Sequence, residues 1–159
     1  MAIMNNNNRW LKAGALLPVL ILAGCAASLP SRDAGSSPAA LAQQADDAYD
    51  SGNLAKSERL YTRLTKMSPQ TAIFWYRLGN IQARSGEPYK AISSYSAALH
   101  RKPHMAEAWY NMGLVQLRLA AITFDSMKNN TKPDDPLYKQ GQDYLEGIMQ
   151  LMGSASADR

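Results

Sequence analysis

Apolar residues recur at intervals of three and four through residues 40–66, the spacing that places side chains on one face of an α-helix. Residues 40–50 carry such a face in Leu41, Ala45 and Ala48, and residues 54–66 carry a second one. Runs of alternating β-branched residues, which are typical of strands, are absent from the sequence. The pattern predicts an all-α fold that begins with a pair of helices.

A fixed period of 34 residues relates three consecutive stretches of the chain. A helix pair that repeats along the chain explains such a period, because each pair buries its apolar face against the next pair. Eight pairs of identical residues follow this period: Gly52 and Gly86, Lys56 and Lys90, Tyr61 and Tyr95, Pro69 and Pro103, Trp75 and Trp109, Tyr76 and Tyr110, Gly79 and Gly113, and Gln82 and Gln116.

The middle stretch, residues 72–105, predicts its own helix boundaries. Gly79 has no β-carbon, so a second helix can approach the first one closely there. Tyr95 lies between two alanines on one stripe of that second helix. Gly86 can adopt the positive φ that ends a helix, and Pro103 ends the following one. We also expect Trp75 to be buried between the two helices.

The third stretch departs from this pattern. No glycine stands at position 120, one period after Gly86, and apolar residues continue at helical spacing. The sequence therefore predicts one extended helix over residues 106–128. Residues 129–133 break it, and Asp134 or Asp135 can cap a last amphipathic helix. Residues 153–159 are predicted to form a disordered tail.

The landmarks W-x2-L-G, A-x3-[FY] and a closing proline, repeated every 34 residues, resemble those of the tetratricopeptide repeat. The resemblance implies a helix-turn-helix solenoid of about three repeats with a C-terminal capping helix, over residues 39–152. It also implies a protein partner, an extended peptide or a helix, bound in a concave groove that the first helices line. The predicted groove residues are Tyr76, Arg77, Asn80, Arg84, Tyr110, Asn111, Leu114 and Arg118.

Asn80 and Asn111 lie 31 residues apart, like two asparagines that hold a peptide backbone in carboxylate-clamp tetratricopeptide domains. The other clamp positions do not match, because Tyr76, Gly141 and Leu145 stand where that family has basic residues. The resemblance therefore supports backbone holding by the two amides and argues against a clamp for a terminal carboxylate. An alternative is that both asparagines are only solvated.

Residues 1–24 read as a secretory signal, with Arg9 and Lys12 before an apolar stretch too short to span a bilayer. They end in Leu-Ala-Gly before Cys25, which resembles the lipobox of bacterial lipoproteins. The resemblance implies lipidation of Cys25, and residues 25–38 then form a flexible tether rich in Ser, Ala, Pro and Gly. Ala26 in place of aspartate implies, by the same resemblance, the outer membrane and a periplasm-facing domain.

Charge and motif content narrow the function. Without the predicted signal, 15 basic residues face 13 acidic ones, and no basic cluster is interleaved with aromatic residues. A nucleic-acid partner is therefore not expected. Pro103 separates His100 from His104, and no catalytic or phosphate-binding motif is present, so neither an enzyme, a metal site nor a cofactor is expected.

Two functional hypotheses follow. The first is a non-enzymatic, lipid-anchored adaptor in the assembly of an envelope machine such as a pilus or a secretion system. Small lipoproteins of this kind resemble the pilotins of type IV pili and the lipoprotein of tight-adherence pili. The alternative is a scaffold for cell-wall or exopolysaccharide enzymes. Both rest on analogy of fold and location.

Overall fold

The computed structural model describes residues 37–157, with side chains to residue 153. The predicted signal peptide, Cys25 and nearly all of the predicted tether lie outside these residues. The described part contains helices and no strand. The helices are α1 (Pro38–Asp50), α2 (Leu54–Met67), α3 (Ala72–Arg84), α4 (Pro88–Arg101), α5 (Ala106–Asn130) and α6 (Pro136–Ala157).

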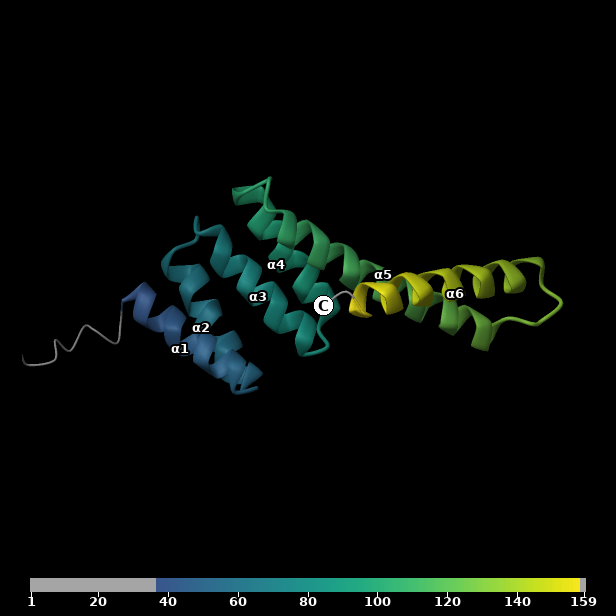
Figure 1. The fold of residues 1–159 in the computed structure, drawn as a ribbon, viewed down its shortest axis with the longest axis horizontal. Coiled ribbons are helices and arrows are strands. Elements are labelled where there is room, and N and C mark those ends of the chain that lie inside the picture. The colour runs from purple at the N-terminus through teal and green to yellow at the C-terminus, as the bar shows by residue number, and fades with distance from the viewer. Residues whose placement is uncertain (1–36, 158–159) are drawn as a thin grey trace, which may run out of the picture. The chain divides into compact units, whose positions relative to one another are not determined.

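The first four helices form two helix-turn-helix pairs, α1 with α2 and α3 with α4. The pairs stack, because α3 also packs on α2, and α5 packs in turn on α4 (Figure 1). In this arrangement α1, α3 and α5 are the first helices of successive repeats. The predicted all-α tetratricopeptide-type solenoid is confirmed.

Glycine turns separate the helices within each of the two pairs. Gly52 and Gly86 have φ values of 78° and 76°, the left-handed region that a residue with a β-carbon rarely adopts. Each glycine follows the serine that caps the preceding helix at its C-terminal end. The repeat of one turn at one period places the second helix of each pair in the same position relative to the first.

The core consists of two clusters, one for each pair. Leu41, Tyr61 and Leu64 belong to the first cluster, which also includes Leu78 of α3. Ala91, Tyr95 and Ala98 belong to the second, and the predicted stripe on α4 is buried. Trp75 packs against both clusters but is only half-buried, so the prediction that it is fully buried was wrong. Its indole edge reaches the surface, where Nε1 donates to the carbonyl of Pro69 at 2.9 Å.

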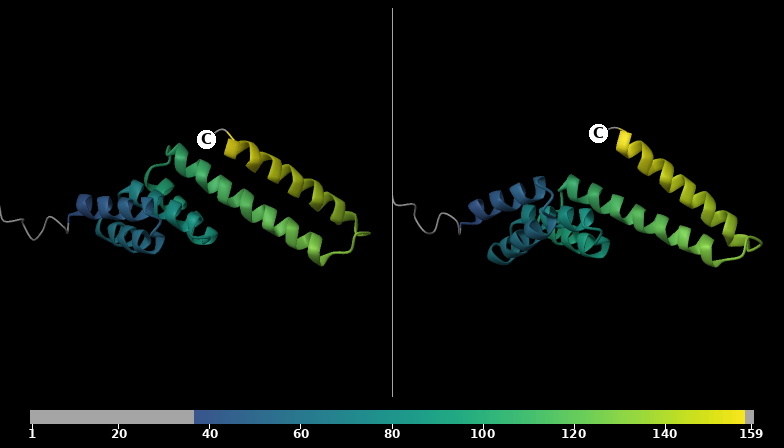
Figure 2. Two further views of the ribbon diagram at one scale, coloured as in Figure 1. Left: turned by 60° about the horizontal axis from the view of Figure 1, so that its bottom comes forward. Right: turned by 90° about the horizontal axis from the view of Figure 1, so that it is seen from below.

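The helix α5 confirms the predicted extension and ends at Asn130. Asp135 caps α6, since its Oδ1 accepts from the backbone N–H of Leu137 at 2.8 Å. From this turn α6 runs back along the second half of α5, and the two helices diverge away from the turn (Figure 2). Near the turn, Gly141 is buried against the side chains of Met127 and Phe124.

The end of α6 lies beyond its predicted boundary. The helix continues to Ala157, whereas the sequence predicts a disordered tail from residue 153. Gly153 lowers helix propensity by about 1 kcal/mol, which is too little to end a helix that packs against a neighbour. The alanines that follow are good helix formers, and no proline intervenes.

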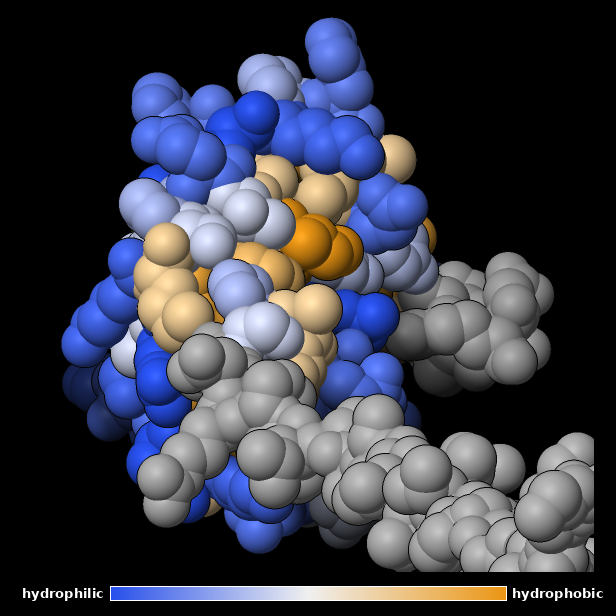
Figure 3. Space-filling model, turned by 90° about the vertical axis from the view of Figure 1, so that its left-hand side faces the viewer, coloured by the Kyte–Doolittle hydropathy of each residue, from blue (hydrophilic) through white to orange (hydrophobic). Residues whose placement is uncertain are grey.

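Figure 3 views the left-hand side of Figure 1, where α1 and α2 lie. On the part of this face that the grey atoms leave visible, hydrophilic side chains form a rim around a smaller hydrophobic group. A polar outer face is expected of a repeat at the end of a stack. Within residues 37–157, no helix combines the length and hydropathy needed to cross a membrane.

Candidate functional site: a groove between the first helices

An open groove of about 550 Å³ lies between the first helices of the three repeats. Both hydrogen-bonding and apolar side chains line it, and arginine is the only charged residue type among them. The lining residues are Tyr49, Asn80, Ala83, Arg84, Tyr95, Asn111, Leu114, Val115, Arg118 and Met152. The groove therefore collects residues from α1, α3, α4, α5 and the end of α6.

Five of the eight predicted groove residues line this groove. They come from two helices whose turns lie side by side, because α3 and α5 are the first helices of adjacent repeats. Their presence in one groove does not test whether they bind a partner, so that role stays a prediction. The five residues are Asn80, Arg84, Asn111, Leu114 and Arg118.

The other three predicted residues lie elsewhere. Tyr76 is half-buried and packs its ring on that of Tyr95, with centroids 6.1 Å apart. Arg77 reaches toward α1, where its Nε lies 4.0 Å from Oδ1 of Asp46. Tyr110 is 52% exposed near the start of α5 and does not line the groove.

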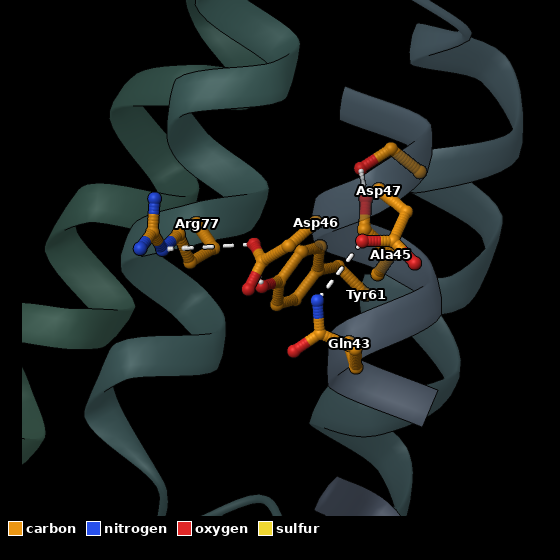
Figure 4. A network of polar contacts seen from close by, with 7 residues as sticks. Gln43, Ala45, Asp46, Asp47, Tyr61 and Arg77 are labelled. Carbon is orange, nitrogen blue, oxygen red and sulfur yellow. Dashed lines mark hydrogen bonds and ion pairs between the residues drawn. The ribbon is translucent and has the colours of Figure 1, made fainter. Parts of the chain in front are cut away.

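A polar network joins the first two repeats (Figure 4). The Tyr61 hydroxyl of α2 donates to Oδ1 of Asp46 in α1 at 2.6 Å. Arg77 of α3 approaches the same carboxylate oxygen, so one acceptor connects three helices. Because Arg77 is about half exposed, this ion pair contributes little on its own. Its role is to align α3 with α1.

The same device recurs one period later with neutral residues. The Tyr95 hydroxyl of α4 donates to Oδ1 of Asn80 in α3 at 2.8 Å. Nδ2 of Asn111 in α5 donates to that same oxygen at 2.9 Å and lies 3.3 Å from the hydroxyl of Tyr76. The spacing of 31 residues between the asparagines thus reflects contact between successive first helices, as it does for Asp46 and Arg77.

This network changes what the two asparagines can offer a ligand. The prediction left both amides free to bind a partner, but Oδ1 of Asn80 and Nδ2 of Asn111 are used within the chain. Nδ2 of Asn80 and Oδ1 of Asn111 form no hydrogen bond within residues 37–153. The pair therefore still presents one donor and one acceptor, the complement of a single peptide unit.

Two arginines give the groove its charge. The guanidinium of Arg84 lies over the Tyr49 ring, 4.9 Å from its centroid, and its Nη1 donates to the Tyr49 carbonyl at 3.4 Å. Arg118 is exposed and forms no ion pair or hydrogen bond with any described residue. No acidic side chain lines the groove. Its electrostatic preference is therefore for negative groups.

Beyond Arg118 the groove continues into an apolar hollow of about 470 Å³ between α5 and α6. Arg118 and Met152 line both spaces, so the polar groove and the apolar hollow adjoin. The side chains of the hollow are mostly aliphatic or contain sulfur. Besides those two they are Ala121, Ile122, Asp125, Ser126, Leu145 and Met149.

The prediction missed lining residues of two kinds. Tyr49 and Tyr95 were assigned only to apolar helix faces, yet the ring of each also reaches the groove wall. The 34-residue period does mark Tyr95, but it does not indicate which end of the side chain is exposed. Met152 is far from the repeats in sequence, and no local signal places the end of α6 near Asn111 and Leu114.

Burial acts on the two tyrosine hydroxyls of the network. It raises the pKa of Tyr61, and the hydrogen bond to Asp46 raises it further. Burial also raises the pKa of Tyr95, with a smaller contribution from neighbouring Tyr76. Both hydroxyls therefore stay protonated and act as donors at neutral pH. Within the described residues, no cluster of His, Cys, Asp or Glu could hold a metal ion.

Stacked helix pairs with a groove along their first helices define a helical-repeat protein. A model of the tetratricopeptide repeat family matches residues 42–103 and 83–121, which together span half of the chain. The chain therefore belongs to the tetratricopeptide repeat family, whose repeats typically mediate protein–protein interactions. Comparison with curated proteins found no matching relative.

Proposed function

We propose that the protein is a non-enzymatic adaptor, held at the outer membrane by a lipid on Cys25, whose groove binds a protein partner during assembly of an envelope machine. A pilus or a secretion system is such a machine. The observation that carries the proposal is the pair of unused amide atoms on Asn80 and Asn111, set between two arginines in an open groove.

The groove chemistry describes the partner. Nδ2 of Asn80 donates to a backbone carbonyl of the bound segment, and Oδ1 of Asn111 accepts from a backbone N–H. Arg84 and Arg118 attract acidic side chains at this end of the segment. The adjoining hollow accepts apolar side chains farther along. The segment therefore contains acidic residues followed by apolar ones, and its backbone supplies the central contact.

The address of the protein rests on residues 1–38. A single acyl chain binds membranes only weakly, whereas several chains on one residue anchor stably. A lipidated Cys25 followed by the predicted tether presents the repeat domain to partners at the membrane surface, facing the periplasm. The short sequence between Cys25 and Ser37 keeps the groove near that surface.

The membrane proposal is tested by Cys25→Ser. We expect the variant to leave the membrane fraction and to lose labelling with palmitate, because the sequence contains no other cysteine. The wild-type chain expressed in the same strain is the control. A Cys25→Ser variant that still sediments with outer membranes and still takes up the label contradicts the anchor.

The partner proposal is tested by crosslinking in intact cells, followed by purification and identification of the captured proteins. Arg118→Glu reverses charge in the groove at a residue that makes no described hydrogen bond or ion pair. Arg63→Glu makes the same change on exposed α2, outside the groove. We expect Arg118→Glu alone to lose the partner, by roughly 10-fold or more in recovered complex.

The identity of the captured proteins separates the two hypotheses. Pilus or secretion-system components that are lost from Arg118→Glu and kept by Arg63→Glu support the proposal. Glycan synthases or hydrolases with the same dependence support instead a scaffold for cell-wall or exopolysaccharide enzymes. Equal recovery by both variants means that the groove does not bind the partner.

A further inference from the structure

The second helix of the middle repeat covers four landmark positions on α3. Gly79 lies under the ring of Tyr95, so close that an added β-carbon would be 2.6 Å from Cε1. Tyr76 packs on the same ring. Gln82 is 7% exposed, and its Oε1 accepts from the hydroxyl of Ser94 at 2.7 Å. Trp75, the fourth position, lies beneath the guanidinium of an α4 arginine.

The same four residue types recur on α5, and there they are open. Trp109 is 54% exposed and Tyr110 is 52% exposed. Gly113 has no heavy atom within 4 Å of where its β-carbon would be, and Gln116 is exposed. We call these four residues the open α5 face. Its side chains match a surface that α4 covers on α3, but no described helix covers it here.

The last helix does not fill this position. Its contacts with α5 include Gly141 against Met127 and the ring of Tyr144 5.4 Å from that of Phe124. These contacts lie on the second half of α5, beyond the open α5 face. Figure 2 shows the same arrangement, with α6 joined to α5 at the turn and separating from it along the chain. One helix is missing from the third repeat.

The outer surface of α6 has the features that a replacement for α4 needs. Tyr144 is 56% exposed, and three residues later Gly147 is exposed with no heavy atom near its missing β-carbon. On α4, Tyr95 is likewise followed three residues later by a small residue, Ala98. An aromatic ring beside a small residue is what allows α4 to approach Gly79 closely.

Exposed apolar side chains concentrate on these two helices. Of the ten large hydrophobic residues exposed in the described part of the chain, seven lie on α5 or α6. Such a concentration is typical of an interaction surface. Charge does not oppose self-association, because α5 carries two acidic and two basic residues and α6 carries two acidic residues and one basic one. Two copies of the hairpin are almost neutral.

We propose that two copies of the chain associate through their α5–α6 hairpins, with α6 of each copy lying on the open α5 face of the other. A foreign helix would cover α5 and leave the outer surface of α6 exposed. A second copy covers both at once, because each copy supplies the helix that the other lacks. The interface is isologous and forms a four-helix bundle, with the Tyr144 ring of one copy over Gly113 of the other.

The oligomeric state of the full chain, purified in mild detergent, tests the proposal by light scattering across a range of concentrations. We expect a dimer for the wild type. Gly113→Leu places a side chain where the second copy docks but meets nothing within its own chain, so it should weaken the dimer about 10- to 100-fold while leaving helix content unchanged. Ser93→Leu, on the exposed side of α4, is the matched control and should remain dimeric.

Crosslinking assigns the contact. Copies carrying Gly113→Cys and copies carrying Tyr144→Cys, with different tags, are expressed together and oxidised. We expect a disulfide-linked dimer that contains both tags, and none from copies that carry only the natural Cys25. A monomeric wild type, a dimer indifferent to Gly113→Leu, or a missing mixed-tag crosslink overturns the proposal. A photocrosslinker at position 113 that captures only another protein also overturns it, in favour of a foreign helix.

Discussion

The pair α3–α4 and the hairpin α5–α6 begin with the same residues and end as different structures. Both first helices carry a tryptophan, a tyrosine, a glycine and a glutamine at matching positions. In α3–α4 the second helix covers these residues over its whole length. In α5–α6 the second helix arrives about four turns later, and the same residues are exposed.

One turn accounts for the difference. Gly86 adopts a φ of 76° and ends the path of α3, so α4 folds back at once. One period later Ala120 stands in place of that glycine, and alanine is the best helix former. The helix α5 therefore continues to Asn130 before a break allows α6 to return. The landmarks of a repeat are not sufficient for its packing, which also requires the turn.

The largest expected contrast concerns the tyrosines of the two second helices. Tyr95 is 1% exposed, and Tyr95→Ala should destabilise the domain by about 3–5 kcal/mol, as truncation of a buried aromatic does. Tyr144→Ala, at a side chain 56% exposed, should cost less than about 1 kcal/mol in the isolated monomer. Urea unfolding followed by circular dichroism measures both. Equal losses would mean that the two hairpins are packed alike.

The glycines should differ in sign. Gly79→Ala forces a β-carbon against the Tyr95 ring and should cost about 1–3 kcal/mol. Gly113→Ala meets nothing in its own chain and should stabilise the monomer by about 0.5–1 kcal/mol through helix propensity. Thermal melts at a concentration low enough to keep the chain monomeric compare the two variants. Destabilisation by Gly113→Ala there would show that α5 is already covered within one copy.

A smaller effect is expected at the asparagine network. Leucine stands naturally at position 114, one period after Asn80, where no second-helix tyrosine follows. Asn80→Leu removes the acceptor of the Tyr95 hydroxyl, and the unpaired group should cost roughly 1–2 kcal/mol. Adding Tyr95→Phe should recover part of that loss, because it removes the unpaired hydroxyl. Denaturant melts of both single variants and the double variant form the cycle; strict additivity would deny the contact.

The last contrast appears only at high pH. Burial raises the pKa of Tyr95 above its ordinary value of 10.0, so the folded state keeps a proton that the unfolded chain releases. This stability is fully present below pH 10 and is lost as pH rises beyond it. Melting temperatures measured above pH 10 should therefore fall less steeply for Tyr95→Phe than for the wild type. Parallel curves would show that the hydroxyl titrates normally in the fold.

Much of the fold was predictable, because it depends on local and periodic signals. The 34-residue period predicts the stacked pairs, and the missing glycine at position 120 predicts the long α5. The end of α6 was predicted too early, because contact with a neighbouring helix outweighs the weak propensity of Gly153. The exposure of Trp75 was also misjudged, since its distance from the surface depends on what surrounds its indole edge.

The groove divides in the same way. The period alone determined that α3 and α5 are equivalent first helices, so Asn80, Arg84, Asn111, Leu114 and Arg118 could be assigned to one face. Only the tertiary structure decided that the two asparagines bond to each other and leave one donor and one acceptor unused, that Met152 joins the groove, and that Trp109 and Gly113 lie open. Helix faces follow from the order of residues along one helix. Contacts between helices depend on how far each helix runs before it turns, and that distance decides which landmarks are covered.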